Sequence, residues 1–404
     1  MKILTKQDLW DSVIGGSILA TGGGGIAPSI ERFNATVSHV FEKKLECKLV
    51  NIQDIPNDSC VFYGIGAGGG IERELKNKYM AYPSYADLFI NGFDPLKFIK
   101  YQIKEKKFLL NSWSEIPDGE WENTTEKKLV ELIGEKPFAY CPSEIGPNIW
   151  GQLLNAARKG KPVVDCDTAG YRAVPELSLT SLNVMNVTIV PAVLATVWGD
   201  MLIYEKVLSW QRFEDINRFV AAISGGEASG LMSIEGSILK ESVIHGTVSK
   251  AIAIGRAVRE AREIGKDTIE AILHVTGGYK LFEGKIVSFI REDKYAFAWG
   301  ETRLDGVGQF ADHTFEIWFK NENQISWLDS EPYVTCPDPI NIVDSKTGKG
   351  LSNFYQQDFQ TGREVTVIGL KCADIWRTER GLKIYNPRHF GFDIPYTPIQ
   401  KFFE

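Results

Sequence analysis

Acidic side chains in two short segments have the spacing needed for acid–base chemistry. Glu144 lies within Pro142–Asn148. Further along the chain, Asp165 and Asp167 lie on either side of Cys166. Each of these two segments directly follows a short apolar run. Crowding raises the pKa of at least one carboxyl in such a group, which suits a general acid or base, and the same oxygens suit a divalent cation. The structural alternative is that Asp165 or Asp167 caps the turn that follows it.

Other polar residues close to these carboxylates are candidates for binding or proton transfer. Asn148 could contact a ligand, and Arg172 could hold a substrate carboxylate or pair internally with Glu176. His245 precedes a predicted helix N-terminus, where the neutral ring is favoured, so it is a reserve acid or base. Cys166 is a weaker candidate for a nucleophile because the neighbouring negative charges disfavour its thiolate.

Two glycine-rich segments offer backbone amides to a ligand. Exposed N–H groups of such loops bind anions, oxyanions or carbonyl oxygens. The alternative is that these glycines permit only tight turns and close helix packing. The predicted binding residues in the two segments are Thr21, Gly22, Gly23, Gly24, Gly25, Gly66, Gly68 and Gly69.

The second glycine segment also satisfies a dinucleotide fingerprint. Gly64, Gly66 and Gly69 match G-x-G-x-x-G after a predicted strand, and Asp87 lies at about the right distance. Pro83, however, disfavours the strand that Asp87 would have to end. We therefore expect no NAD, FAD or PLP, and a divalent metal remains an open alternative.

Short apolar runs indicate the elements that position these residues. Val61–Tyr63, Phe138–Cys141 and Val163–Val164 each end in turn residues, and 149–159 has helical spacing. The order strand, helix, strand predicts a parallel α/β sheet whose strand C-termini share one edge. We expect the glycine loops and the carboxylates to gather at that edge.

The remaining pattern predicts helices first and a β-rich region later. The predicted helices are 8–20 with Asp8 as N-cap, 28–42, 247–262, and a short helix capped by Asp267; the predicted later strands are 285–290, 314–319 and 364–368, with a turn at 320–323. We predict an α/β domain over residues 1–275 and a β-rich barrel or sandwich over 276–404. Residues 76–123 are predicted to form an insertion or lid.

Composition narrows the class of protein. The chain has 404 residues, a net charge of −7 and 44% hydrophobic residues. Mild acidity argues against nucleic acid as a partner, and no apolar segment is long enough to span a membrane. The six cysteines are widely spaced, so we expect reduced, mostly buried thiols. We predict a cytoplasmic homo-oligomer.

The segments, taken in order, resemble the S-methyl thiohydantoin desulfurase family, which is often labelled hydantoinase-like. The resemblance covers nearly the whole chain. The segments that carry it are 20–25 (ATGGGG), 142–148 (PSEIGPN), 165–176 (DCDTAGYRAVPE), 246–249 (GTVS), 321–323 (NEN), 337–338 (PD) and 391–392 (GF).

The resemblance implies an α/β N-terminal part, a β-rich C-terminal part, and hydrolysis of a cyclic S-methyl thiohydantoin with release of methanethiol. We hypothesise that Asp165 or Asp167 activates water and that Glu144 serves as acid or as partner of a ring nitrogen. The amides of 22–25 and 66–69 would hold the ring carbonyls. The alternatives are a non-catalytic subunit that senses a small metabolite and a metal-dependent cyclic amidohydrolase.

Overall fold

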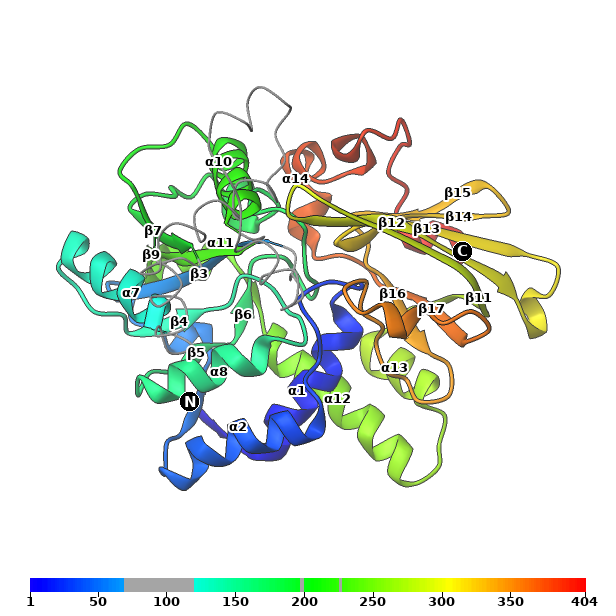
Figure 1. Cartoon of the computed structure of the whole chain (residues 1–404), viewed down its shortest axis with the longest axis horizontal. Helices are drawn as coiled ribbons and strands as arrows, with labels where there is room; N and C mark the ends of the chain where they lie inside the picture. Colours follow the sequence, from blue (N-terminus) through cyan, green and yellow to red (C-terminus); the bar gives the residue numbers. More distant parts are fainter. Residues whose placement is uncertain (69–119, 197–199, 225–226) are drawn as a thin grey trace, which may run out of the picture.

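A computed structural model describes residues 1–68, 120–196, 200–224 and 227–404. The described residues form two large β-sheets joined by helices, with sheet A on the left of Figure 1 and sheet C on the right, and one two-stranded sheet. The predicted glycine contact at Gly69, and residues 76–119 of the predicted insertion, lie outside the described residues.

Sheet A has the strand order β1-β2-β5-β4-β3-β9-β7-β8. Its centre is parallel, because β2 pairs with β5, β5 with β4 and β4 with β3, as the apolar runs predict. The antiparallel strands β9, β7 and β8 extend the sheet beyond β3 and were not predicted. The strands are β1 (Lys2–Leu4), β2 (Cys47–Val50), β3 (Cys60–Gly68), β4 (Ala139–Cys141), β5 (Val163–Val164), β7 (Ala192–Thr196), β8 (Met201–Tyr204) and β9 (Glu227–Glu235).

Helices cover both faces of sheet A because alternate residues of its strands point to opposite sides. Val61 and Tyr63 of β3 pack in one cluster with Phe213 of α10 (Trp210–Ile223). Phe62, between them, packs in another cluster with Leu129 of α7 (Glu120–Ile133). The further elements around the sheet are α2 (Ile30–Glu42), α8 (Ile149–Arg158), α9 (Ser181–Val184), α11 (Gly236–Ser242), and the two-stranded pair β6 (Cys166–Asp167) and β10 (Ile244–His245).

The predicted helices are confirmed, with one correction at the first N-terminus. Helix α1 spans Lys6–Leu19, and its N-cap is Thr5 rather than Asp8. Asp8 is the third helical residue, and its carboxylate accepts from the Thr5 amide while Thr5 accepts from the Asp8 amide. This reciprocal capping box gives a hydrogen-bond acceptor to two backbone amides, whereas a single cap would give one to only one of them.

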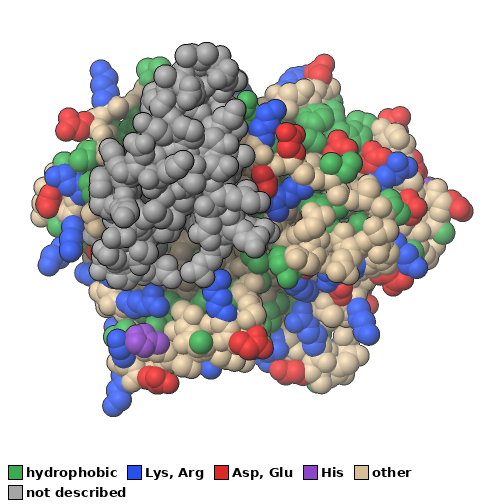
Figure 2. Space-filling view, viewed as in Figure 1, with side chains coloured by type: hydrophobic (Ala, Val, Ile, Leu, Met, Phe, Trp, Pro, Cys, Tyr) green, Lys and Arg blue, Asp and Glu red, His purple; other side chains and the backbone are tan. Residues whose placement is uncertain are grey.

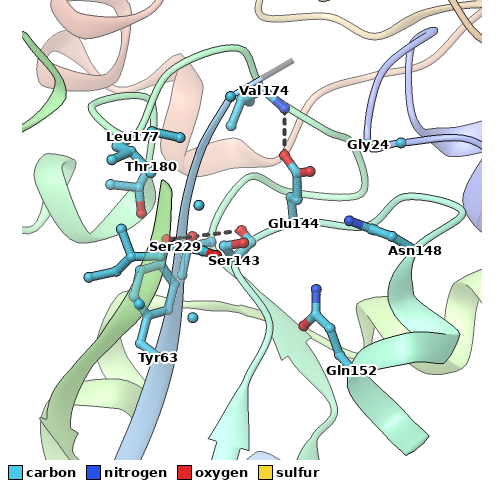
Figure 3. Close-up of a pocket in the computed structure, with 18 of the residues that line it drawn as sticks. Gly24, Tyr63, Ser143, Glu144, Asn148, Gln152, Val174, Leu177, Thr180 and Ser229 are labelled. Atoms are coloured by element: carbon cyan, nitrogen blue, oxygen red, sulfur yellow. Dashed lines mark hydrogen bonds between the residues drawn. The ribbon is translucent and has the colours of Figure 1, made fainter. Parts of the chain in front are cut away.

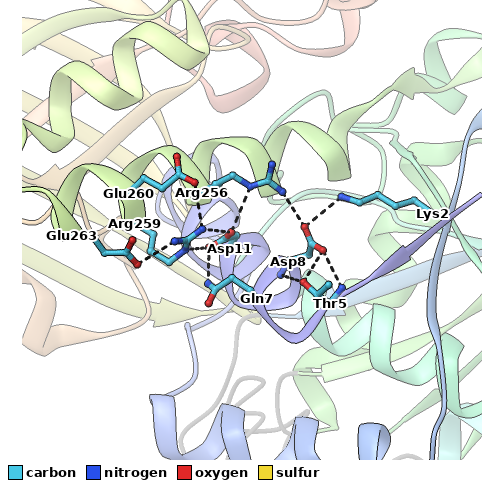
Figure 4. A network of polar contacts seen from close by, with 9 residues as sticks. All are labelled: Lys2, Thr5, Gln7, Asp8, Asp11, Arg256, Arg259, Glu260 and Glu263. Carbon is cyan, nitrogen blue, oxygen red and sulfur yellow. Dashed lines mark hydrogen bonds and ion pairs between the residues drawn. The ribbon is translucent and has the colours of Figure 1, made fainter.

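Helices α1 and α12 (Thr247–Glu263) cross closely and are joined by ion pairs (Figure 4). Asp11 is buried and accepts from Nε of Arg259 at 2.9 Å. A Cβ at Gly255 would lie 1.8 Å from the Asp11 carbonyl oxygen, and one at Gly15 would lie 1.8 Å from the Ala251 carbonyl oxygen. The missing side chains therefore allow the two helix backbones to touch.

Sheet C is a curled antiparallel half-barrel, in agreement with the predicted β-rich region. Its order is β15-β14-β13-β12-β11-β17-β16. The strands are β11 (Tyr279–Lys294), β12 (Phe297–Gly306), β13 (Thr314–Lys320), β14 (Glu322–Leu328), β15 (Glu331–Thr335), β16 (Ile340–Asp344) and β17 (Glu364–Gly369); α13 (Thr268–Thr276) precedes them and α14 (Glu379–Ile384) follows.

One hydrophobic cluster links the helices of sheet A to sheet C. Val343 of β16 and Ile368 of β17 pack in the same cluster as Ile18 of α1 and Ile272 of α13. Five of the six cysteines are buried and all six are free thiols, as expected. No helix among the described residues is long and apolar enough to cross a membrane. Figure 2 shows acidic and basic side chains interspersed over the visible face.

We predict that Gly255→Ala lowers the free energy of unfolding by about 1–3 kcal/mol, because the added methyl group forces α1 and α12 apart. The matched control is Gly151→Ala in α8, where a Cβ meets nothing within 4 Å, and it should be neutral or stabilise by up to ~1 kcal/mol. Urea unfolding of both variants checks this. Equal stability of Gly255→Ala and wild type would contradict the packing argument.

Candidate active site

A cavity of about 540 Å³ opens at the carboxyl ends of β3 and β4. Strand β4 stops at Cys141, which is opposite Tyr63, whereas β3 continues through Gly68 paired with β9. The sheet therefore opens on that side of β3. The cavity lies at the edge where the sequence predicts that ligand-binding loops meet.

Glu144 lies on the loop that follows β4, and its side chain faces the cavity (Figure 3). Its Oε2 accepts from the Val174 amide at 3.0 Å. Burial and, to a lesser extent, the charge of Asp167 outweigh the lowering effect of the Val174 bond and of Arg172, so the pKa of Glu144 is raised to about 7. A carboxyl with this pKa can both accept and donate a proton near neutral pH.

A chain of hydroxyl groups fixes the start of the Glu144 loop. The Thr168 hydroxyl donates to the Ser143 carbonyl oxygen at 2.8 Å. Since that uses its one hydrogen, the Tyr63 hydroxyl is the donor in the 2.9 Å bond between Tyr63 and Thr168. Strand β3 thus holds the residue before Glu144.

Glu322, the first residue of β14, brings a second carboxyl to the same cavity. It is only 2% exposed, and its Oε1 accepts from the Gly24 amide at 3.3 Å. Its Oε2 has no hydrogen-bond partner among the described residues. Burial and the neighbouring charge of Glu144 raise the pKa of Glu322 well above its usual range, which favours the protonated form of this carboxyl.

The first glycine loop packs on sheet C and thereby places Glu322 at the cavity. The backbone N–H of Asn323 donates to the Thr21 carbonyl oxygen, and the backbone N–H of Asn353 donates to the Gly22 carbonyl oxygen, both at 2.7 Å. A Cβ at Gly23 would lie 1.7 Å from Oε1 of Glu322. The loop therefore needs glycine to make room for the carboxyl, and only Gly24 and Gly25 of the five predicted residues line the cavity.

Amide side chains and the second glycine segment form the rest of the polar lining. Asn148 and Gln152 point toward the space beside Glu144 (Figure 3), and Asn148 makes no capping bond to α8. Gly66 and Gly68 line the cavity within β3. Because β3 is continuous through Gly68, the first two glycines of the dinucleotide fingerprint lie in a strand and not in the turn that it requires.

Asp165 and Asp167 do not line the cavity. Instead, their carboxylates accept hydrogen bonds from backbone amides around it. The Asp165 carboxylate accepts from the amide and hydroxyl of Ser249, the third residue of α12. Asp167 is buried and accepts from the amides of Gly170 and Tyr171, as in the predicted alternative of a turn cap. Burial nevertheless raises the pKa of Asp167 to about 7.

His245 and Cys166 face each other across the β6–β10 pair, away from the cavity lining. His245 is exposed, and its Nε2 is 2.9 Å from the Lys240 carbonyl oxygen. Cys166 is buried with its Sγ 3.5 Å from Sγ of Cys141, and burial raises the pKa of its thiol well above the usual value. Because its thiolate form is disfavoured, the Cys166 thiol is a poor nucleophile.

Arg172 is fully buried and does not line the cavity. It donates to the carbonyl oxygens of Ala173 and Pro337 and lies over the Tyr385 ring. The alternative that Arg172 pairs with Glu176 is wrong, because Arg172 makes no bond to Glu176 among its hydrogen bonds and ion pairs within the described residues.

Glu176 lines the cavity, but other side chains of the protein already bind its carboxylate. It accepts from Nζ of Lys320 at 2.6 Å and lies 2.9 Å from Nε2 of His389. Although burial opposes ionisation, these two partners lower the pKa of Glu176 to about 2. Glu176 is therefore an anion whose charge is neutralised inside the protein.

Glu322 was not among the predicted site residues, although its segment 321–323 is one of those that carry the family resemblance. It lies in the segment 320–323, which was predicted as a turn, whereas only Asn321 (φ 57°) separates β13 from β14. The available signal was the run of polar residues Glu322, Asn323 and Gln324 before the apolar end of the strand. Among the described residues, no group of three or more His, Cys, Asp or Glu side chains is placed to hold a metal ion.

Comparison with known proteins places the chain in a family. The S-Me-THD-like N-terminal domain matches residues 112–206, and the S-Me-THD-like C-terminal domain matches 209–399. The chain belongs to the S-Me-THD-like family. The family domains meet between β8 and α10, inside sheet A, whereas the predicted division at 275/276 stays a prediction.

A solved structure supports the fold of this S-Me-THD-like chain. A crystal structure of a protein from Chromobacterium violaceum is 18% identical, with a TM-score of 0.69 over 99% of this chain and 100% of the other. This likeness concerns the fold alone. No curated protein matches the sequence.

The raised pKa of Glu144 predicts a specific dependence of stability on pH. Its value is 4.5 before folding and about 7 after, so its contribution is complete below pH 4.5 and is lost as the pH rises to about 7. Relative to wild type, Glu144→Gln should therefore gain about 2 kcal/mol in unfolding free energy between pH 5 and pH 7.5. Urea unfolding at the two values measures it.

Glu176→Gln is the control because the pKa of Glu176 is shifted the other way, to about 2. Its stabilisation is complete above pH 4.5 and is lost only as the pH falls toward 2. This variant should lose the same stability at pH 5 as at pH 7.5. A Glu144→Gln curve parallel to wild type between these values would show that Glu144 titrates normally.

Proposed function

We propose that the protein is a hydrolase of a small cyclic amide or thioimidate, such as an S-methyl thiohydantoin. The observation that carries the proposal is the Glu144 carboxyl, with a pKa of about 7, in a cavity at the carboxyl ends of β3 and β4. Membership of the S-Me-THD-like family supports this ring as the substrate class.

The reaction is a displacement at C2 of the ring. Water adds its oxygen to C2 and the bond from C2 to sulfur breaks. One proton of the water leaves with methanethiol, the other ends on the ring nitrogen, and C2 becomes a carbonyl. Glu144 takes the proton from water and returns a proton to the leaving sulfur or to the ring nitrogen. Its pKa near 7 suits both steps, because the basic and the acidic form of the carboxyl are both populated at neutral pH.

We assign the base to Glu144 rather than to Asp165 or Asp167, which were favoured from the sequence. Asp165 is bonded to Ser249 at the start of α12, and Asp167 to the amides of its own turn. The amides of Asn148 and Gln152 are placed to hold a ring carbonyl (Figure 3).

Incubation of the purified protein with S-methyl thiohydantoins and hydantoins should release methanethiol or open the ring. Glu144→Gln should lower kcat by about 10²-fold or more, because the general base is lost. Asp165→Asn should change kcat less, since its effect passes through α12. A larger loss in Asp165→Asn than in Glu144→Gln would reverse the assignment, and ring binding without turnover would favour a metabolite sensor.

A further inference from the structure

Two of the six free thiols lie close enough to each other to form a bond. Sγ of Cys141, at the end of β4, is 3.5 Å from Sγ of Cys166 in β6. The sulfur atoms of a disulfide are about 2.0 Å apart, so these two need to approach by only about 1.5 Å. Among the hydrogen bonds of the described residues, this contact alone joins two cysteines.

The backbone segments that carry the two thiols are already bonded to each other. The Ser143 carbonyl oxygen accepts from the backbone N–H of Thr168 at 3.1 Å and from the Thr168 hydroxyl at 2.8 Å. Each of these residues lies two positions after one of the cysteines. The two chain segments are therefore held together directly beyond the thiols, and the sulfur atoms can reach bonding distance with little backbone movement.

The two thiols differ in their access to a small molecule. Cys141 lines the cavity, whereas Cys166 is fully buried outside the lining. Burial, the neighbouring Cys141 and the charge of Asp167 raise the pKa of the Cys166 thiol well above its usual value. Because the thiolate is the reactive form, we expect Cys141 to react first with a molecule in the cavity and Cys166 to react second.

We propose that Cys141 and Cys166 form a modification site at which hydrogen peroxide produces a reversible disulfide beside the Glu144 loop. This inference goes beyond the proposed function, because the disulfide forms without turnover of any ring. The oxidant is small, as entry to a thiol at the wall of the cavity requires.

The oxidation has two steps. The Cys141 sulfur attacks one oxygen of the peroxide, the O–O bond breaks, and the other oxygen leaves as water with the proton of the thiol. The product is a sulfenic acid, whose sulfur is then attacked by the Cys166 sulfur. The S–S bond forms, the S–O bond breaks, and a second water leaves with the proton of Cys166. The two thiols lose two electrons, and the peroxide is reduced to water.

The disulfide displaces the start of the Glu144 loop. Cys141 lies three residues before Glu144, and Ser143 between them is held by Thr168, to which the Tyr63 hydroxyl donates. Movement of the Cys141 sulfur toward Cys166 strains this chain of bonds. On the proposed function, the Glu144 carboxyl then leaves the position that it needs for proton transfer, and turnover falls.

The experiment is treatment of the purified wild type with hydrogen peroxide, followed by a count of free thiols in denaturant and by peptide mapping. The count should fall from six to four, because two thiols are consumed, and the intact mass should fall by the mass of two hydrogen atoms. Trypsin cuts after Arg158 and Lys159, between the two cysteines, so the disulfide should join two tryptic peptides. Dithiothreitol should restore all six thiols.

Variants separate this pair from unspecific oxidation. Cys166→Ala and Cys141→Ala should each abolish the linked peptides, and either variant serves if the other does not fold. Cys47→Ala is the matched control because Cys47 is a buried thiol in β2 of the same sheet, and this variant should still form the disulfide. Six free thiols in peroxide-treated wild type would overturn the inference, as would a disulfide that contains Cys60 in place of the pair.

The thiol count and the turnover assay can fail independently. With an S-methyl thiohydantoin that reduced wild type hydrolyses, the oxidised protein should be about 10-fold or more slower, and dithiothreitol should restore the rate. Cys166→Ala should keep its rate after the same treatment. Unchanged turnover with a complete disulfide would contradict the displacement of the loop. Absence of turnover in reduced wild type would contradict the proposed function, whereas the thiol count still decides whether the disulfide forms.

Discussion

The site depends on the docking of the loop 21–25 against the turn between β13 and β14. Backbone bonds from Asn323 and Asn353 hold the loop, and Gly23 leaves the space that the Glu322 carboxyl occupies. This contact brings a residue of sheet C to a cavity at the edge of sheet A, beside Glu144. Without it Glu144 would be the only lining carboxyl among the described residues that is not ion-paired, since Glu176 is bound by Lys320 and His389.

Burial of this carboxyl pair is costly, and the surrounding structure limits the cost. An isolated buried carboxylate is strongly disfavoured, so such a group takes up a proton or finds a compensating charge. Arg172 supplies part of that charge to Glu144 and Glu322 although its own donors are bound to Pro337 and Gln324. The result is an electrostatic environment that favours the protonated forms of both carboxyls.

Local patterns predicted most of the elements but not all of their partners. The parallel strands at 61–63, 139–141 and 163–164 and the helix after β4 follow from apolar runs ended by turn residues. Strand β9 was missed although it pairs with the whole of β3, because 227–235 mixes Gly, Ser and Glu with apolar residues. Its strand conformation is stabilised by pairing inside the sheet rather than by local preference.

The sequence by itself determined that glycine loops and carboxylates would follow strand ends, because strand period, turn chemistry and helix capping act over a few residues. Only the tertiary structure decided which carboxylates face the cavity. Asp167 is bonded to backbone amides of its own turn, whereas Asp165 is bonded to Ser249 across 84 residues of chain and Glu322 reaches Gly24 across 298. No local pattern encodes a contact of that separation, since it arises from the packing of two sheets on shared helices.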